Sequence, residues 1–225
     1  MNKSNLVKNL VIFDLDGTLV NTIDQICNAV YSTRELFDFA QVSKETLVPK
    51  IGLAASELFS DLNLNNTETV KVVDTFRKHL GNVKLSELNL FPCVIDLLNL
   101  LISRNFILSV GTNKPYWIAD KTLKECKIRE KFSFVVGGES LPLKPDKAII
   151  ENCLKHSNTT AAAAIMIGDR VEDMHAATSA TVVAYGVLQG VHDENQLFEA
   201  GAKKVFLDIS DLYESLVTGW NFEDL

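Results

Sequence analysis

A short apolar run near the N-terminus, Val11-Ile12-Phe13, leads directly into Asp14-Leu15-Asp16-Gly17-Thr18. So apolar a run is typical of a strand that is covered on both faces, as strands are in parallel sheets. Such a strand would deliver two carboxylates, one residue apart, to one edge of the sheet. Carboxylates this close repel each other unless a cation lies between them, and Mg²⁺ prefers oxygen ligands. The segment therefore predicts a site that binds Mg²⁺ and handles a phosphate group.

Similar apolar runs recur along the chain and alternate with stretches of helical spacing. The expected strands cover residues 10–13, 106–110, 134–136, 164–167 and 181–185. The expected helices between them cover residues 93–104, 116–127, 147–156 and 172–179. This alternation predicts an α/β fold whose core is a doubly wound parallel sheet.

The stretch from residue 20 to residue 88 has a different pattern. It offers helical spacing over residues 24–37, 43–51 and 67–80, and no convincing strand. A single crossover rarely needs about seventy residues, so we expect an inserted α-helical cap domain over 20–88. The core domain would then comprise residues 1–19 and 89–225. The alternative is that these helices belong to the layers that cover the main sheet.

Composition and charge exclude several classes of partner. The net charge is −7 and the pI is about 5.1, so the chain lacks the excess of Lys and Arg typical of nucleic-acid and anionic-membrane binding. The four cysteines are widely separated and form no CxxC pair, which favours core thiols in a reducing compartment. No signal-peptide pattern and no membrane-length apolar segment occurs. We therefore expect a cytoplasmic protein, either monomeric or homodimeric.

Polar residues follow three of the expected strands, and ligands bind outside the carboxyl ends of such strands. Asp14 and Asp16 follow the first, Gly111-Thr112-Asn113-Lys114 follows the second, and Gly168-Asp169-Arg170 follows the fourth. Asp173 stands shortly after, and Lys144 lies in the loop Leu143-Lys144-Pro145. These side chains are expected to meet at one sheet edge.

The order Asp-x-Asp-Gly-Thr, Thr-Asn, Lys-Pro and Gly-Asp-x-x-x-Asp closely resembles the four motifs of the haloacid dehalogenase superfamily, most of whose members are phosphatases. The resemblance covers nearly the whole chain, and the helical insert is similar to that family's first type of cap. Val110-Gly111-Thr112-Asn113-Lys114-Pro115 and Leu143-Lys144-Pro145-Asp146 look most like the branch of phosphoglycolate phosphatase and related small-molecule phosphatases.

The resemblance implies a chemical role for each motif residue. Asp14 would be the nucleophile that takes the phosphoryl group, and Asp16 the general acid and base. The Mg²⁺ ligands would be Asp14, Asp16 through its backbone carbonyl, and Asp169, with Asp173 supporting them.

Phosphate recognition and specificity are assigned in the same way. Thr112, Asn113 and Lys144 would bind the phosphate, and Lys144 would also contact the nucleophile. Lys50 in the cap and Tyr116 after the second motif are candidates for substrate specificity. The implied substrate is a small phosphorylated metabolite, either phosphoglycolate-like or a sugar phosphate.

Other interpretations stay open at this point. A phosphomutase similar to β-phosphoglucomutase would use the same nucleophile, and an inert binding module could share the fold. Dehalogenation is disfavoured because Asp16 supplies an acid that carbon–halogen attack does not need. A response-regulator receiver is too short to account for this chain, and no GxGxxG follows the first strand, which disfavours dinucleotide binding.

Individual residues also have simpler interpretations. Thr112-Asn113 could be a plain turn, Lys144 a solvated loop lysine and Asp173 a first-turn acid favoured by the helix dipole. Arg170 and Glu172 are expected at the surface. Many relatives carry glycine at the position of Thr181, where it forms a left-handed helix cap. Since threonine disfavours that conformation, the preceding helix is expected to end differently.

Overall fold

The computed structural model describes residues 10–82 and 89–222. Six parallel strands form one sheet in the order β5-β4-β1-β6-β7-β8. Their bounds are β1 Leu10–Phe13, β4 Ile107–Gly111, β5 Phe134–Val136, β6 Ala164–Gly168, β7 Val183–Val187 and β8 Ala202–Phe206. The predicted α/β class and doubly wound sheet are thereby confirmed. The strand β8 was missed, because two of the five residues in its sequence Ala-Lys-Lys-Val-Phe are lysines, as suits an edge strand.

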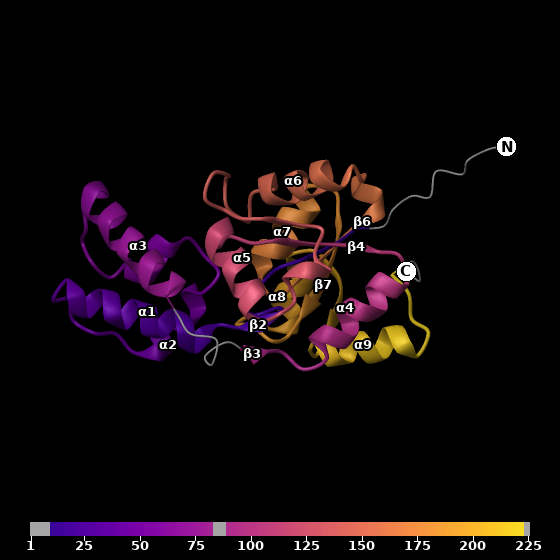
Figure 1. Ribbon diagram of the computed structural model, residues 1–225, viewed down its shortest axis with the longest axis horizontal. Coiled ribbons are helices and arrows are strands. Elements are labelled where there is room, and N and C mark those ends of the chain that lie inside the picture. Colours follow the sequence, from indigo (N-terminus) through magenta and orange to yellow (C-terminus); the bar gives the residue numbers. More distant parts are fainter. Residues whose placement is uncertain (1–9, 83–88, 223–225) are drawn as a thin grey trace.

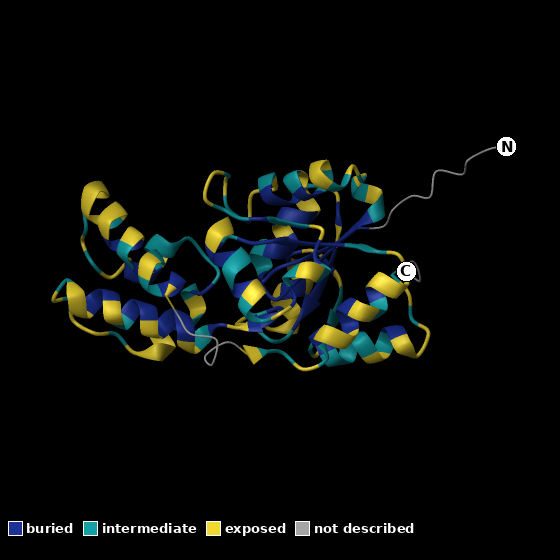
Figure 2. Ribbon diagram, viewed as in Figure 1, coloured by how far each residue is buried: buried dark blue, intermediate teal, exposed yellow. Residues whose placement is uncertain are grey.

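Helices cover both faces of the sheet (Figure 1), with bounds α4 Val94–Ser103, α5 Tyr116–Glu125, α6 Ala148–Ser157, α7 Val171–Ser179, α8 Glu194–Glu199 and α9 Ile209–Val217. Alternate residues of β1 serve opposite faces. Val11 and Phe13 pack in a cluster with residues of α4, α5 and α9. Leu10 and Ile12 pack in a second cluster with residues of α6, α7 and α8. Burial on both faces explains why the central strands are so uniformly apolar (Figure 2).

Three further helices lie together at one end of the molecule (Figure 1): α1 Ile23–Leu36, α2 Lys44–Leu47 and α3 Asn66–Gly81. They have their own apolar core, in which Val30, Leu58 and Phe76 are buried. Helix α3 begins with a capping box, because the side chain of Asn65 accepts from the N–H of Glu68 and the reverse bond also forms. These helices therefore pack mainly on one another and do not form a layer over the sheet.

Two short strands flank this helical segment. β2 Val20–Asn21 precedes it and β3 Asn89–Leu90 follows it, and the two pair antiparallel. Both chain crossings between sheet and helical segment thus run side by side. The predicted domain boundary after residue 88 abuts residues 83–88, which lie outside the described residues, so the proposed division at 20–88 stays a prediction.

Helix α7 ends in a way that the sequence did not suggest. Thr181 adopts the left-handed conformation, with φ of 60°. Its N–H donates to Thr178 O, and the N–H of Val182 donates to Ala177 O, both at 2.9 Å. These two bonds form a Schellman motif. The expectation that threonine would change the helix end is therefore wrong: the turn keeps its left-handed residue despite the β-branch.

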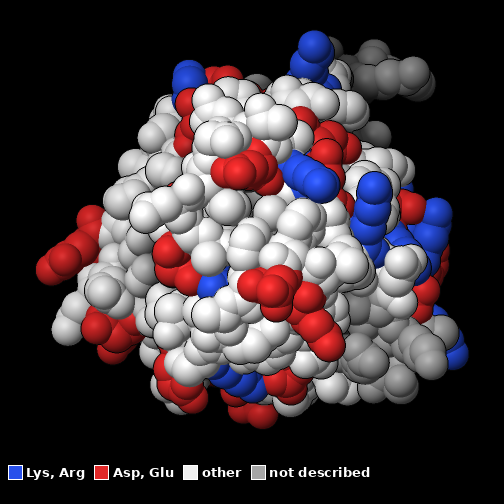
Figure 3. Space-filling view, turned by 90° about the vertical axis from the view of Figure 1, so that its left-hand side faces the viewer, with Lys and Arg blue, Asp and Glu red and all other residues white. Residues whose placement is uncertain are grey.

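Over residues 10–82 and 89–222, we find no helix with both the length and the apolar character needed to cross a bilayer. On the face formed by the helical end of the molecule, Lys and Arg side chains are interspersed with Asp and Glu (Figure 3).

Candidate active site

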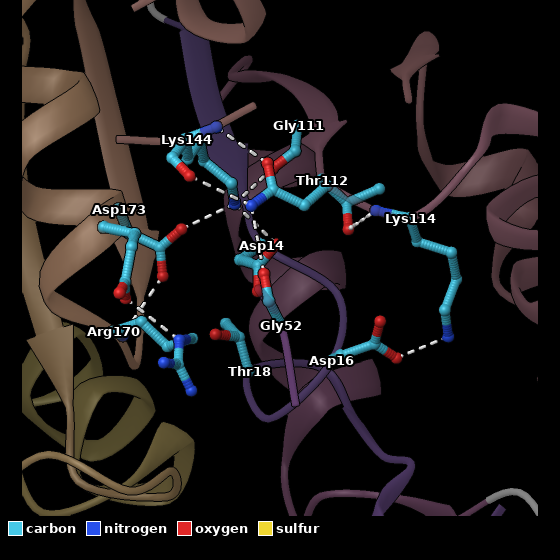
Figure 4. Close-up of polar contacts among 12 residues, drawn as sticks. Asp14, Asp16, Thr18, Gly52, Gly111, Thr112, Lys114, Lys144, Arg170 and Asp173 are labelled. Carbon is cyan, nitrogen blue, oxygen red and sulfur yellow. Dashed lines mark hydrogen bonds and ion pairs between the residues drawn. The ribbon is translucent and has the colours of Figure 1, made fainter. Parts of the chain in front are cut away.

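The site lies at the carboxyl ends of the central strands β4, β1 and β6 (Figure 4). Asp14 follows β1, Thr112 follows β4 and Asp169 follows β6. Because β1 pairs with β4 on one side and with β6 on the other, the three residues converge. The structure thus brings together motifs that are more than 150 residues apart in the chain, such as Thr18 and Asp169.

Lys144 is the centre of the buried polar network. Its Nζ donates to Asp14 Oδ1 at 2.7 Å, to Asp173 Oδ1 at 2.6 Å and to the carbonyl of Gly111 at 2.9 Å. The side chain is 3% exposed, so this is a buried ammonium with three acceptors. Burial acts to lower the pKa of Lys144, but Asp14 and Asp173 outweigh it and raise that pKa above its ordinary value. Lys144 is thus charged and fixed, and is no solvated loop lysine.

Three carboxylates surround the same point. Asp14, Asp169 and Asp173 each offer an oxygen atom, and these atoms all lie within 4.8 Å of one another. Burial and the nearby Asp173 raise the pKa of Asp14 to about 6, although Lys144 opposes the shift. The pKa of Asp169 is raised well above its ordinary value, first by burial and then by Asp14 and Asp173. Carboxylates crowded in this way require more positive charge than one lysine supplies.

Asp16 is not part of this carboxylate cluster and forms an ion pair with Lys114. Lys114 Nζ donates to Asp16 Oδ1 at 2.5 Å, and both side chains are buried. Sequence reasoning did not pair these two residues. The available signal was position alone, since Lys114 follows Thr112-Asn113 at the same sheet edge. Figure 4 shows the Asp16 carboxylate beside Lys114 and apart from Asp173.

The buried charges fit a divalent cation. Four acids, Asp14, Asp16, Asp169 and Asp173, face two buried lysines, Lys114 and Lys144, which leaves two negative charges uncompensated. Arg170 does not change this balance, because it is paired with Glu172. Clustered carboxylate oxygens are the donors that Mg²⁺ prefers. The cluster of Asp14, Asp169 and Asp173 is therefore compatible with Mg²⁺.

Close backbone approach shapes the turn after Asp16. Gly17 has a φ of +86°, and a Cβ there would come within 2.5 Å of Asp169 Oδ2. Gly190 crowds the same oxygen, since a Cβ there would lie 1.9 Å from it. Thr18 Oγ1 completes the surroundings by donating to Asp169 Oδ1 at 2.6 Å. Asp169 is therefore held by the Thr18 hydrogen bond in a space that a Cβ at either glycine would fill.

Thr112 and Asn113, which follow β4, form several hydrogen bonds with other loops and strands of the protein. The N–H of Thr112 donates to Val136 O, and its Oγ1 accepts from the N–H of Lys114 at 3.2 Å. Asn113 ties loops together: Nδ2 donates to Lys144 O and to Gly52 O, and Oδ1 accepts from the N–H of Lys144. The assignment of Thr112 and Asn113 to phosphate binding stays a prediction, and the structure gives Asn113 an additional role in holding the loop.

A cavity of about 70 Å³ separates the sheet edge from the helical segment. Its walls include the apolar Ile26, Leu58, Phe76 and Leu80, together with Asp14, Asp16, Lys50, Arg77 and Lys114. Lys50 also donates from Nζ to Ser60 Oγ at 2.9 Å. Tyr116 is 42% exposed and is absent from the described lining, and its N–H donates to Glu139. Arg77, which sequence reasoning did not single out, brings a second cap cation to the cavity.

Arg170 was expected at the surface, and this is wrong. The residue is 5% exposed, and its guanidinium donates to the carbonyls of Ile51 and Pro49 in the helical segment. Glu172 is also largely covered, since its side chain is 17% exposed and accepts from Arg170 Nε. The periodicity of a sequence does not show when a distant segment folds over a loop. The burial of Arg170 and Glu172 could therefore not be predicted from neighbouring residues.

The chain is similar to known proteins over most of its length. The profile of the haloacid dehalogenase-like hydrolase family matches residues 11–187. The phosphoglycolate phosphatase of Mannheimia succiniciproducens is 29% identical over 214 residues, which cover 90% of this chain and 96% of that protein. Pyrophosphatase PpaX of Listeria welshimeri is 28% identical, over 90% of this chain and 93% of its own. The crystal structure of a predicted phosphatase from Clostridium acetobutylicum, 25% identical, has a TM-score of 0.83 and covers 94% of this chain and 99% of that one.

The fold, the carboxylate cluster with its buried lysine and the profile match define the class: the chain belongs to the haloacid dehalogenase-like hydrolase family. Within that family it is a phosphatase, an enzyme that hydrolyses phosphoric monoesters.

Proposed function

We propose that this phosphatase hydrolyses a small phosphorylated metabolite, of the size of phosphoglycolate or a sugar phosphate, through a phosphoryl group carried briefly by Asp14. The observation that carries the proposal is the contact between Asp14 Oδ1 and Lys144 Nζ at 2.7 Å, buried beside Asp169. Lys144 holds the carboxylate in one orientation and supplies positive charge where an anionic phosphate would approach. A carboxylate and a phosphate at about 4 Å would otherwise repel by roughly 4 kcal/mol per unit charge at an effective dielectric of about 20.

The reaction would proceed in two displacements. A carboxylate oxygen of Asp14 attacks phosphorus, the bond to the ester oxygen breaks, and Asp16 protonates the departing oxygen. Asp16 then removes a proton from water, and the water oxygen attacks phosphorus and releases Asp14. Lys114, which contacts Asp16 at 2.5 Å, would supply positive charge beside that carboxylate while it is ionised between the two steps.

Asp14, Asp169 and Asp16 through its backbone carbonyl would hold Mg²⁺, with Asp173 supporting them. When bound, Mg²⁺ would neutralise negative charge on the phosphate and on the clustered acids. Thr112, Asn113 and Lys144 would receive the phosphate oxygens.

The cavity supports a small, anionic substrate. Its lining combines apolar side chains with Asp14 and Asp16 on the core side, and its cap side carries Lys50 and Arg77. A second anionic group, such as a carboxylate, would suit these two cations. The relatives named phosphoglycolate phosphatase agree with such a substrate, and the relative named pyrophosphatase suggests including pyrophosphate as a competitor. We propose the cytoplasm as the site of action, since all four cysteines are free thiols.

A substrate panel tests the proposal: phosphoglycolate, sugar phosphates and pyrophosphate, with Mg²⁺ and release of inorganic phosphate as the readout. Asp14→Asn should lower the rate by about 10³-fold or more, because the amide cannot form the phosphoryl bond. Asp146→Asn is the matched control, since Asp146 is exposed and only accepts from the N–H of Ala148. Activity of Asp14→Asn equal to that of the control would refute the nucleophile assignment. A phosphosugar isomer formed without free phosphate would select the mutase instead, and Mg²⁺ binding without any turnover would select the binding module.

A further inference from the structure

We infer that Arg170 is a positioning residue, which holds the cap loop of residues 49–52 against the two catalytic loops and thereby sets the cavity wall that faces the substrate. The inference rests on the proposed function only for its kinetic consequence. Its structural basis is the set of contacts that join this one core side chain to the helical segment.

Each of the three guanidinium nitrogens of Arg170 donates a hydrogen bond. Nη1 donates to Ile51 O at 2.6 Å, Nη2 donates to Pro49 O at 3.2 Å and Nε donates to Glu172 Oε2 at 3.0 Å. A buried arginine is stable only where its donors are satisfied, and here two of the acceptors belong to another segment of the chain. If the loop moved away, Arg170 would lose both, and two carbonyls of the loop would lose a charged donor.

The loop is shaped to receive this side chain. Gly52 has a φ of +91°, and a Cβ at this position would come within 2.7 Å of Arg170 Cδ. The carbonyl of the same glycine accepts from Asn113 Nδ2 at 3.0 Å. Three carbonyls of the loop, those of residues 49, 51 and 52, thus accept hydrogen bonds from donors of the core.

The two core donors come from the loops that supply the chemistry. Arg170 follows Asp169 directly, and its backbone N–H donates to Asp173 Oδ2 at 3.1 Å. Asn113 follows Thr112 and is also bonded to the backbone of Lys144. Docking of the cap loop is therefore linked to the geometry of the carboxylate cluster (Figure 4).

The loop carries the residue that most needs positioning. Lys50 lies between the bound carbonyls of Pro49 and Ile51, and it lines the cavity together with Ile51, Gly52 and Leu53. Fixing the carbonyls on both sides of Lys50 fixes its backbone. Without Arg170 the cavity wall and Lys50 would lose their defined place, and substrate affinity would fall before the chemical step is affected.

Amide hydrogen exchange of the whole chain, without Mg²⁺ or substrate, tests the structural part. The N–H groups of Ile51 and Leu53 are bonded within the loop, to Val48 O and Lys50 O, and report its opening. In Arg170→Ala they should exchange about tenfold faster or more, while the amides of β1 and β6 stay as in the wild type. Arg170→Lys should behave almost like Arg170→Ala, because a lysine has one terminal nitrogen, whereas the two terminal nitrogens of the planar guanidinium each reach a different carbonyl.

Arg129→Ala is the matched control. Arg129 also donates to a carboxylate and to a backbone carbonyl, those of Asp120 and Phe132, but it does not touch the cap loop. Its loss should leave the exchange of Ile51 and Leu53 unchanged. If Arg170→Ala instead unfolds globally, Arg170→Lys keeps the charge and the apolar stem, and its loop exchange decides the matter.

Kinetics supply the functional part. With the best substrate of the panel, Arg170→Lys should raise KM by about tenfold with a smaller change in kcat, and leave the Mg²⁺ half-saturation concentration unaltered. Wild-type loop exchange in Arg170→Lys would overturn the inference. A change confined to Mg²⁺ half-saturation would overturn it too, because it would show that Arg170 acts on the carboxylate cluster and not on the cap loop. If the wild type hydrolyses nothing, the proposed function fails, while the exchange experiment still decides the role of Arg170.

Discussion

Lys144→Met is the substitution that most directly probes the buried charge balance. The methionine keeps an unbranched apolar side chain of similar length, so packing around the stem changes little. What disappears is the ammonium, which contacts Asp14 at 2.7 Å and Asp173 at 2.6 Å in a setting where all three side chains are almost fully buried. The variant therefore leaves three neighbouring carboxylates with no buried cation among them.

The expected cost follows from this geometry. Removing one partner of a buried ion pair costs about 3–5 kcal/mol, because the remaining charge stays desolvated and unpaired. For a chain of 225 residues a loss of 1 kcal/mol lowers Tm by about 2–4 °C, so Tm should fall by about 6–20 °C. Lys147→Met is the control: Lys147 pairs with Glu151 at the same 2.7 Å, but both side chains are half exposed. Its loss should cost about 0.5 kcal/mol or less.

The pH dependence provides a second, independent signature. A carboxyl whose pKa is raised in the folded state stabilises the fold at low pH, and this contribution is lost as the pH rises through the folded pKa. For Asp14 that window extends from about 4, its unfolded value, to about 6 in the wild type. Without Lys144 the pKa of Asp14 rises further, so the window extends to higher pH. Lys144 itself stays protonated throughout, because its pKa is raised above the ordinary value for lysine.

Urea unfolding of the Mg²⁺-free protein at pH 5 and pH 8 measures both effects. Lys144→Met should lose more stability at pH 8 than at pH 5, where Asp14 and Asp169 take up protons and the repulsion declines. The control variant should show no such difference. Our account of the charge balance is refuted if Lys144→Met costs less than about 1 kcal/mol at pH 8, or if its cost is the same at both pH values.

Three more outcomes are expected from the same structure. Mg²⁺ should stabilise the wild type by about 2.7 kcal/mol at 100 times its Kd, and this effect, measured by thermal shift, should weaken below pH 6 as Asp14 binds a proton. Gly190→Ala should weaken Mg²⁺ binding in calorimetry by about 10–100-fold, since its Cβ would displace the Asp169 carboxylate, whereas Gly219→Ala, with nothing within 4 Å, should leave it unchanged. Thr181→Gly should raise the free energy of unfolding by about 1 kcal/mol, because glycine adopts a φ of 60° without the Cβ penalty; an equal gain in Thr181→Ala would contradict this reason.

The sequence predicted the core of the fold because burial on both faces leaves a strong local signal. Strand β1 is apolar at every position, and the predicted range 134–136 coincides with β5. Strand β7 was placed two residues early, because the left-handed turn at Thr181 delays its start at Val183. The helix expected over 43–51 is instead the short α2 followed by a 3₁₀ turn over Val48–Lys50, since Pro49 cannot continue an α-helix from within.

The site was predictable to the extent that each acid or lysine follows a strand or precedes a proline. The ion pair of Lys114 with Asp16 could not be predicted in this way. The two residues are 98 positions apart and meet only because β1 pairs with β4. Arg77 was missed for a similar reason. It lies on α3, and only the packing of that helix beside the sheet edge brings it to the cavity.

The burial of Arg170 and the loop contacts of Asn113 share one physical origin. In each of these two loops a residue that serves the cluster or the phosphate position is followed directly by one that binds the cap loop: Thr112 by Asn113, and Asp169 by Arg170. In each loop, two adjacent residues thus serve different neighbours: one belongs to the reacting centre and the next binds the cap loop. Because the cap loop covers both loops, Asn113 and Arg170 donate to its backbone carbonyls instead of to water. These polar residues therefore connect the position of the cap loop to the residues of the reacting centre.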